Sequence, residues 1–178
     1  MKNKLKSIYD KKELCCVFYN EYDTEIFLIG WIVNFDTEYF IMECINSKGY
    51  NNGFVCRLID SIIKIETKSK YLQSVEKLFY SNKQSRANLF KQTDNCLKSF
   101  LTHATEYERI CFIELCESDN LDAVGYINHH NDEEVVIVNI DECGESDGEE
   151  CLEFERISAV TLGNEEIIRL EKLHIINK

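Results

Sequence analysis

The sequence predicts a mainly β protein made of two small five-stranded barrels related by an internal duplication, with short helices and one connecting helix. Three observations predict this fold class. Residues from about 14 to 79 recur 95 positions later without a gap. Short runs rich in Ile, Val, Phe and Tyr are bounded by Asn, Asp and Gly, as strands are, and glycines fall at the same places in both copies.

The duplication is clearest when residues 30–78 are compared with residues 125–173. Eleven of these 49 pairs are identical, whereas ordinary residue frequencies would give roughly three. The pair Cys16/Cys111 extends the match upstream. The identical pairs are Gly30/Gly125, Ile32/Ile127, Glu38/Glu133, Ile45/Ile140, Gly49/Gly144, Gly53/Gly148, Cys56/Cys151, Ile62/Ile157, Glu76/Glu171, Lys77/Lys172 and Leu78/Leu173.

Both copies have the same expected order of elements. Strands are predicted in the first copy at residues 14–19, 26–33, 39–45, 54–58 and 61–66. Their counterparts in the second copy are residues 110–116, 121–129, 135–140, 151–154 and 157–162. Each copy then closes with a short helix, for which Ser69 and Asn164 are the expected N-caps.

Five short strands cannot bury both faces as a flat sheet, so each copy is expected to curl into a barrel. Gly30 and Gly125 lie in mid-strand, where a glycine usually marks a bend. A connecting helix is predicted over residues 85–105, and a weaker one before the first copy, where Leu5 and Ile8 are the apolar candidates. The expected domains are a first barrel at residues 1–82, the connecting helix at 83–105 and a second, acidic barrel at 106–178.

Residues 27–42, with the sequence Phe-Leu-Ile-Gly-Trp-Ile-Val-Asn-Phe-Asp-Thr-Glu-Tyr-Phe-Ile-Met, resemble the first conserved segment of Sm-like proteins. They share its mid-strand glycine, Gly30, and its aspartate in the hairpin turn, Asp36. The order of one helix and five strands is also similar to the SH3-like barrel. The resemblance implies an SH3-like or Sm-like barrel for each copy. It does not carry over the uridine pocket, because the residues that form it in Sm-like proteins are absent.

The two halves of the chain differ strongly in net charge. Residues 1–100 hold 15 Lys and Arg against 12 Asp and Glu, whereas residues 101–178 hold 5 against 20. The densest acidic run, residues 141–150, is predicted to be a solvated loop, with a basic protein partner and calcium as the alternatives. The candidate partner-binding residues in this run are Asp141, Glu142, Glu145, Asp147, Glu149 and Glu150.

The nine cysteines favour reduced thiols in the cytoplasm, because their number is odd and no export signal is present. No Cys-x-x-Cys pair exists, and Cys111 and Cys116 have the odd spacing that puts them on opposite faces of a strand. No metal or cofactor site is therefore predicted. Cys56 and Cys151 recur in both copies and are expected to be buried in the cores.

The histidines do not form a recognisable catalytic motif. His129 and His130 are interpreted as part of a surface hairpin turn, and His103 and His174 as residues at a helix surface or helix end. A Cys–His pair would be needed for nucleophilic catalysis, and no spacing selects one thiol. Phosphate-binding glycine motifs are absent as well, so no catalytic residue is predicted.

The sequence is consistent with three hypotheses about function. The leading hypothesis is a non-enzymatic binding or regulatory protein that acts through protein–protein contacts of its tandem barrels. The first alternative is binding of single-stranded RNA by the first barrel, with Trp31, Tyr39, Tyr50, Lys64, Lys68 and Lys70 as candidate contacts. The second is an acidic inhibitor or immunity-type protein for a nucleic-acid-processing enzyme.

No apolar run is long enough for a membrane span. The lack of proline, together with abundant Asn, Lys and Ile, suggests a bacterial or phage origin.

Overall fold

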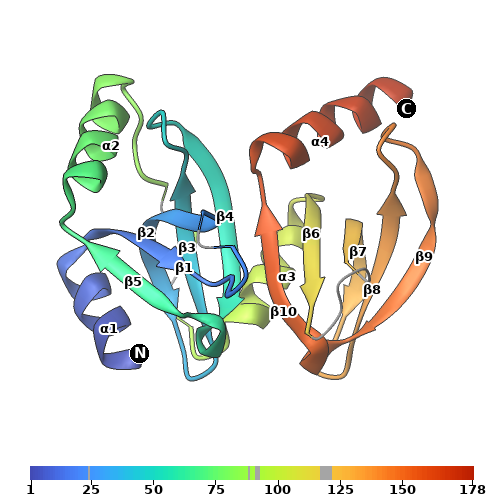
Figure 1. The fold of residues 1–178 in the computed structure, drawn as a ribbon. Coiled ribbons are helices and arrows are strands. Elements are labelled where there is room, and N and C mark those ends of the chain that lie inside the picture. Colours follow the sequence, from blue (N-terminus) through green and yellow to red (C-terminus); the bar gives the residue numbers. More distant parts are fainter. Residues whose placement is uncertain (24, 88, 91–92, 117–121) are drawn as a thin grey trace. The chain divides into compact units, whose positions relative to one another are not determined.

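The computed structural model describes residues 1–23, 25–87, 89–90, 93–116 and 122–178 (Figure 1). In this part of the chain it contains ten β-strands and four α-helices, which confirms the mainly β character. The chain divides into two compact units, unit 1 at Met1–Cys96 and unit 2 at Leu97–Lys178. Each unit is described by itself.

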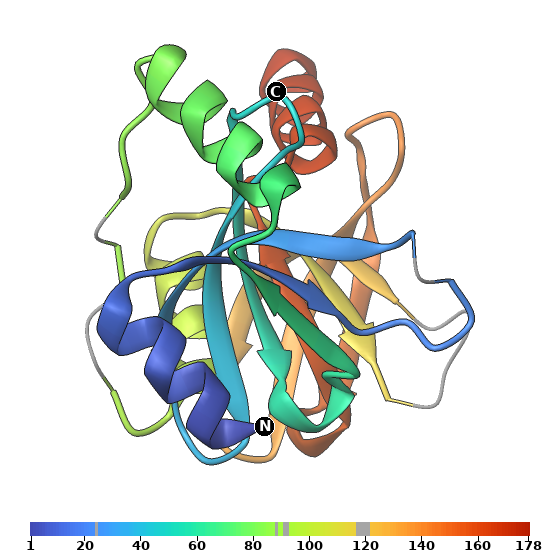
Figure 2. The same ribbon diagram turned by 60° about the vertical axis from the view of Figure 1, so that its left-hand side comes forward.

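Unit 1 holds five antiparallel strands in the order β5-β1-β2-β3-β4. Helix α1, predicted only from Leu5 and Ile8, is present and buries both side chains. In two views α2 lies at the upper end of this unit and α1 at the lower end (Figures 1 and 2). The elements are α1 (Lys2–Lys11), β1 (Leu14–Phe18), β2 (Phe27–Phe35), β3 (Tyr39–Ile45), β4 (Asn51–Leu58), the 3-10 turn η1 (Ile59–Ser61), β5 (Lys64–Thr67) and α2 (Lys70–Ser81).

Unit 2 has the same order of strands, β10-β6-β7-β8-β9, and a helix at each end. The second predicted strand, residues 121–129, is observed as Ala123–His130, and residue 121 lies outside the described residues. The elements are α3 (Cys96–Glu106), β6 (Ile110–Leu115), β7 (Ala123–His130), β8 (Glu134–Ile140), β9 (Ser146–Glu153), the 3-10 turn η2 (Phe154–Arg156), β10 (Ile157–Leu162) and α4 (Glu165–Asn177).

The sheet of each unit is open, so the expected closure into a barrel is not seen. Among the described residues β5 pairs with β1 but not with β4, and β9 pairs with β8 but not with β10. Strand β5 has only four residues, and all four are already matched with β1. The other edge of β5 has no strand partner among the described residues, so the sheet of unit 1 is not closed.

The predicted bend glycines lie in mid-strand, each between two neighbouring strands. Gly30 in β2 lies opposite Cys15 of β1 and Cys44 of β3. A Cβ atom at Gly30 would lie 1.9 Å from the carbonyl oxygen of Glu43, and a Cβ at Gly125 would lie 1.9 Å from that of Val138. Because no real Cβ contact is that short, only glycine lets the neighbouring backbone pass at these two points.

Several local hydrogen bonds recur 95 positions apart. The Asp36 side chain accepts bonds of 2.7 Å from the N–H groups two and three residues further on, and Asn131 accepts equivalent bonds of 2.7 and 2.9 Å. The predicted N-caps are also observed, because Ser69 accepts from the N–H of Leu72 and Asn164 from that of Ile167. The two units therefore use the same turn and cap chemistry at matching positions.

The first strands do not follow the shift of 95. Cys15 lies opposite Gly30, whereas Cys111 lies opposite Gly125, so the strands correspond at a shift of 96. The thiols of Cys15 and Cys111 each donate to the carbonyl oxygen of the facing glycine, at 3.6 and 3.5 Å. The pairing of Cys16 with Cys111 is therefore wrong by one residue, and the match is not free of gaps. The sequence cannot show this, because Cys15 and Cys16 are adjacent and identical.

In each unit one packed cluster lies between the sheet and the C-terminal helix, and in unit 1 α1 also buries Leu5 and Ile8, while β3 is buried along its whole length. In unit 1 the rings of Trp31 and Phe79 meet edge to face, with centroids 5.0 Å apart. The unit 1 cluster is Leu14, Cys16, Ile29, Trp31, Ile45, Leu72, Val75 and Phe79. The corresponding cluster of unit 2 is smaller and consists of Ile110, Ile140, Ile167 and Leu170, with Phe112, Val124 and Tyr126 packed against it.

The predicted connecting helix begins later than expected. Residues 85–105 were expected to be helical, but α3 starts at Cys96, and residues 88, 91 and 92 lie outside the described residues. Before the helix, the chain is held against β3 by Glu43, which accepts a 2.7 Å bond from the N–H of Ala87. Burial raises the pKa of this carboxyl, although the Ala87 N–H and Arg86 oppose the shift. A tertiary contact thus overrides the helical spacing.

Candidate functional site

The acidic run of residues 141–150 is the predicted loop only in part, because residues 141–145 form a turn and residues 146–150 belong to a strand. Its turn is followed by β9, which starts at Ser146 and extends to Glu153. Asp, Glu and Gly are weak strand formers, so their composition favoured a loop. Strand β8, the Val- and Ile-rich neighbour, supplies the pairing that makes these residues a strand.

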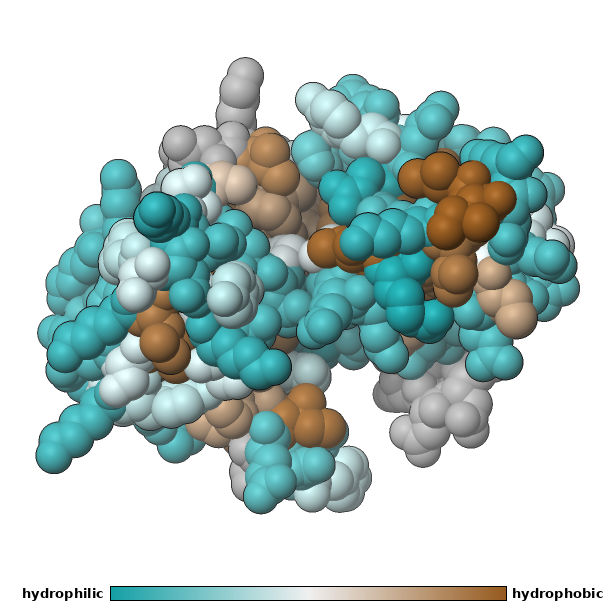
Figure 3. Space-filling view, turned by 90° about the horizontal axis from the view of Figure 1, so that it is seen from above, coloured by the Kyte–Doolittle hydropathy of each residue, from teal (hydrophilic) through white to brown (hydrophobic). Residues whose placement is uncertain are grey.

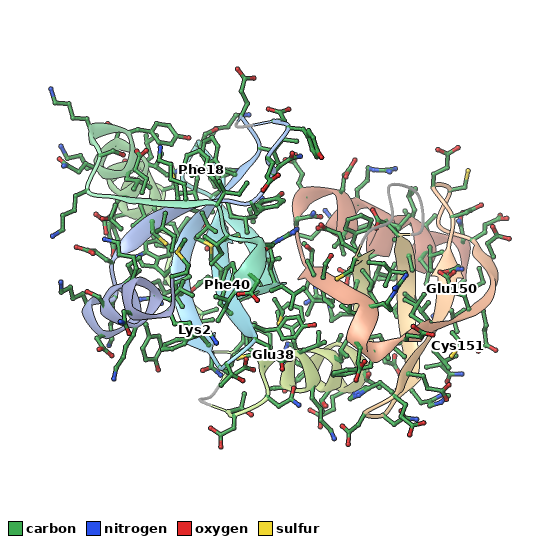
Figure 4. All side chains as sticks on the ribbon, turned by 60° about the horizontal axis from the view of Figure 1, so that its bottom comes forward. Lys2, Phe18, Glu38, Phe40, Glu150 and Cys151 are labelled. Atoms are coloured by element: carbon green, nitrogen blue, oxygen red, sulfur yellow. The ribbon has the colours of Figure 1, made fainter. Side chains whose placement is uncertain are left out.

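Strand β9 exposes most of its side chains. Leu152 is the one buried residue of the strand, and Glu150 is half-buried. Because successive side chains point to opposite faces, Glu149, Cys151 and Glu153 share the other face, and all three are exposed. In Figure 4, Glu150 and Cys151 lie on the outermost strand of unit 2. This strand therefore presents carboxylates from both of its faces.

The outer backbone edge of β9 carries no strand partner in the described part of the chain. The register with β8 is irregular between Val138/Glu149 and Ile140/Ser146, and Gly148 has a φ of 80° there, as in a β-bulge. From Glu149 to Glu153 the pairing is regular. This stretch has the free N–H and C=O groups of an edge strand, which can accept a further strand.

The carboxylates of β9 have no ion-pair partner in the described part of unit 2. Among the described residues, no Lys, Arg or His lies within ion-pair distance of Glu149, Glu150 or Glu153. Glu149 accepts only a neutral bond of 2.9 Å from Asn128. Glu153 lies directly opposite Glu134 on β8, and like charges in that position are destabilising. Glu134 and Glu153 complete the acidic edge, although they lie outside the run that the sequence singled out.

The hairpin tip is held in place by α4. Helix residue His174 was expected near the surface, but it is 7% exposed, and its Nδ1 atom lies 2.8 Å from the carbonyl oxygen of Gly144. Asn177 donates a 2.9 Å bond to the carbonyl oxygen of Cys143, as Asn82 does to Lys48 in unit 1. These contacts fix the start of β9 relative to the helix.

The six predicted partner-binding residues are therefore not equivalent. Asp141 has a structural role, because its Oδ1 atom accepts bonds of 3.0 and 2.8 Å from the N–H groups of Cys143 and Glu145. Glu142 and Glu145 are exposed at the tip, Asp147 and Glu149 are exposed along β9, and Glu150 is half-buried. Glu149 and Glu150 lie in the regularly paired stretch of the free edge, and these two, with Glu153, are the principal candidates.

A Cys–Glu–His group lies on the same face, but it does not favour thiol catalysis. The Cys151 thiol donates to Glu134 Oε2 at 3.1 Å, and Glu134 Oε1 lies 3.7 Å from His129 Nε2. The hydrogen bond to Glu134 raises the pKa of Cys151, which keeps the sulfur protonated. Cys151 was expected in the core and is instead exposed, whereas Cys56 is buried near Cys96 and Asp36.

The thiols should divide into a protected and a reactive set. Cys143 and Cys151 are exposed, whereas six others are buried and Cys15, for example, has its pKa raised to about 12 chiefly by burial. We expect iodoacetamide to modify Cys143 first, Cys151 more slowly because Glu134 raises its pKa, and the buried six only after unfolding. Peptide mapping by mass spectrometry measures this order. A Glu134→Gln variant should bring the rate of Cys151 towards that of Cys143, and an unchanged rate would contradict the role of Glu134.

The candidate RNA contacts of unit 1 are dispersed and partly buried. Trp31 and Tyr39 are 1% and 6% exposed, so their ring faces are not open to bases, whereas Tyr50 is 48% exposed. Lys64 pairs with Glu66 at 3.1 Å and Lys68 with Glu13 at 3.2 Å. Lys70 is exposed in the first turn of α2. The structure does not bring these residues together into one basic, aromatic surface.

Unit 1 also contains a pocket of about 390 Å³ between α1, β2 and the chain after α2. Tyr9, Lys12, Arg86 and Phe90 contribute to its lining. The guanidinium of Arg86 is already engaged, because its Nε atom lies 3.4 Å from Glu43 and its Cζ atom lies 5.1 Å from the centre of the Trp31 ring. The pocket thus offers less uncompensated charge than the acidic edge.

An apolar surface lies on the outer face of α4, where brown side chains gather in Figure 3. Ile168, Ile175 and Ile176 are 39%, 69% and 76% exposed. The corresponding positions of α2 are occupied by Gln73, Tyr80 and Ser81. This surface carries no charge pattern or free backbone edge that selects one kind of partner. The acidic edge of β9 offers both and is the better defined site.

No helix in the described residues is long and apolar enough to cross a membrane, and no group of three or more His, Cys, Asp or Glu side chains among them is placed to hold a metal ion. No protein-family model, curated protein or solved structure matches this sequence and fold.

Proposed function

We propose that this protein is a non-enzymatic binding protein that captures an extended, basic segment of a partner protein along β9. The single observation that carries the proposal is the coincidence of a free strand edge with uncompensated carboxylates at Glu149, Glu150 and Glu153. A segment added as a further strand would satisfy the free backbone groups. Its lysines and arginines would neutralise the carboxylates, which gives the site its selectivity for basic sequences.

The excess of negative charge in unit 2 also supports the binding of a basic segment. Unit 1 holds 14 Lys and Arg against 12 Asp and Glu, whereas unit 2 holds 6 against 20. A field of this sign attracts a basic partner over several ångströms and raises its association rate, and it repels phosphate backbones. The Glu134/Glu153 pair, which is unfavourable in the free protein, would be relieved by a bound cation.

We further propose that both units derive from one duplicated SH3-like or Sm-like barrel, of which one copy became the acidic binding unit. The turn and cap hydrogen bonds that recur at matching positions support this history. A cytoplasmic location suits nine cysteines without a disulfide.

An acidic inhibitor of a nucleic-acid-processing enzyme would use the same edge of β9, because its basic target would meet the same carboxylates. RNA binding by unit 1 is the weaker alternative, since Trp31 and Tyr39 are buried.

The test is the binding of a short fluorescein-labelled peptide in which Lys alternates with Val, followed by fluorescence anisotropy. We expect binding that weakens as salt rises, and a loss of affinity of at least about tenfold in the triple variant Glu149→Gln, Glu150→Gln, Glu153→Gln. The matched control neutralises the exposed Glu106, Glu155 and Glu166 elsewhere in unit 2, and it should bind almost as the wild type does.

Two further peptides separate strand addition from simple charge attraction. A peptide in which Glu replaces each Lys should not bind. A Lys-Val peptide with methylated backbone nitrogens on one edge keeps its charge but cannot pair as a strand, so it should bind much more weakly. Equal loss of binding in the edge variant and in the matched control would contradict the proposal, since the effect would then come from net charge alone.

A further inference from the structure

A second free strand edge is present in unit 1. Strand β5 pairs with β1 on one side, and its other side has no strand partner in the described part of the chain. All four of its residues are at least partly exposed, and Ile63 just before it is 46% exposed. An edge strand of this kind is a natural donor for pairing with another sheet.

The segment around β5 is basic. Residues 63–70 contain Lys64, Lys68 and Lys70 against one carboxylate, Glu66. The side chains of Lys64 and Lys68 are 59% and 71% exposed, although each is close to one glutamate of its own unit. Residues 145–153 of unit 2 contain five carboxylates and no cation. The two free edges of the chain are therefore opposite in charge.

We propose that the strand which β9 captures is β5 of a second copy of this chain. The inference rests on the proposed function of β9 and names its partner. Charge complementarity selects this pairing over the two symmetric ones, because β9 against β9 would bring acidic strands together and β5 against β5 would bring basic ones together. The contact uses two different surfaces, so each copy can bind one neighbour through β9 and another through β5.

This arrangement makes association head to tail. The average size of the assembly should increase with protein concentration and decrease with salt, because the pairing depends on exposed charges. It also predicts complementation. A copy with a damaged β5 edge still has a working β9 edge, and a copy with a damaged β9 edge still has a working β5 edge. The two damaged copies should bind each other as a 1:1 dimer and form no larger assembly.

The experiment measures mass by sedimentation velocity and by light scattering after gel filtration, at low salt across a dilution series. One full-length variant carries Lys64→Glu and Lys70→Glu, and the other carries Glu149→Gln, Glu150→Gln and Glu153→Gln, so that the two damaged edges do not attract each other. We expect each variant alone to be monomeric and an equimolar mixture to form a 1:1 dimer. The control Lys2→Glu, Lys6→Glu reverses two exposed charges on α1 and should associate as the wild type does.

The outcomes separate this inference from the proposed function. If the wild type stays monomeric at low salt while the Lys-Val peptide still binds β9, the self-pairing is wrong and the proposed function stands. If neither is observed, both fail. A wild type that associates while the two variants do not complement each other would also overturn the β5–β9 pairing. Circular dichroism of each variant shows that it is folded, and the salt dependence of the wild type tests the inference without any substitution.

Discussion

Replacing Gly30 by alanine should abolish the native fold of unit 1. The added Cβ would lie 1.9 Å from the carbonyl oxygen of Glu43 and 3.0 Å from the Cα of Cys44. Both are backbone atoms that no side-chain rotation can move, so β2 and β3 must separate. We expect a loss of more than ~3 kcal/mol in the free energy of unfolding, since overpacking against rigid backbone lies at the upper end of its range.

The same substitution at Gly125 should have the same effect on unit 2, because its Cβ would lie 1.9 Å from the carbonyl oxygen of Val138. Gly148 is the matched control: it has a φ of 80° but nothing within 4 Å of the added Cβ. Gly148→Ala should therefore cost only about 1 kcal/mol of backbone strain. Urea denaturation followed by circular dichroism measures all three. Similar midpoints for Gly30→Ala and Gly148→Ala would contradict the close approach of β2 and β3.

Replacing Trp31 by alanine should destabilise the protein by about 3–5 kcal/mol, the range for removing a large buried aromatic side chain. Trp31 is 1% exposed, lies against Phe79 and has the guanidinium of Arg86 over its ring. Its removal leaves a cavity that the surrounding strands and α2 cannot fill without moving.

This result also separates the core role of Trp31 from the RNA hypothesis. Tyr50 is 48% exposed, so Tyr50→Ala should change stability by no more than about 0.5 kcal/mol. Urea denaturation by circular dichroism gives both values, and filter binding of a single-stranded oligonucleotide gives the second readout. Loss of oligonucleotide binding in a Trp31→Ala protein of normal stability would show that the tryptophan contacts a ligand.

The sequence predicts most of the strands because their cause is local. Asp36 and Asn131 are turn residues with their own hydrogen bonds, and Ser69 caps a helix. Each signal needs only its near neighbours in the chain. The mainly β character and the positions of the short helices α1, α2 and α4 follow from such signals, whereas barrel closure depends on pairing between the first and last strands of a sheet and does not.

The features that the sequence misses depend on contacts between distant residues. Strand β9 exists because β8 lies beside it, although its own composition favours a loop. Helix α3 begins late because Glu43, far away in the sequence, holds Ala87. Cys151 is exposed although its counterpart Cys56 is buried, because burial is decided by what packs over a strand and not by the strand itself. The sequence identifies only part of the candidate site for the same reason, because Glu134 and Glu153 join the acidic edge through strand pairing.

The separation of strand partners along the chain also bears on biosynthesis. Every strand that pairs within the sheet of unit 1 lies between Leu14 and Thr67, and Asn82 then holds its hairpin through Lys48. A ribosome adds about 5–20 residues per second. Unit 1 can therefore finish pairing before β6, which begins at Ile110, has emerged from the ribosome. Vectorial synthesis thus limits the exchange of strands between two units whose turns and mid-strand glycines are so similar.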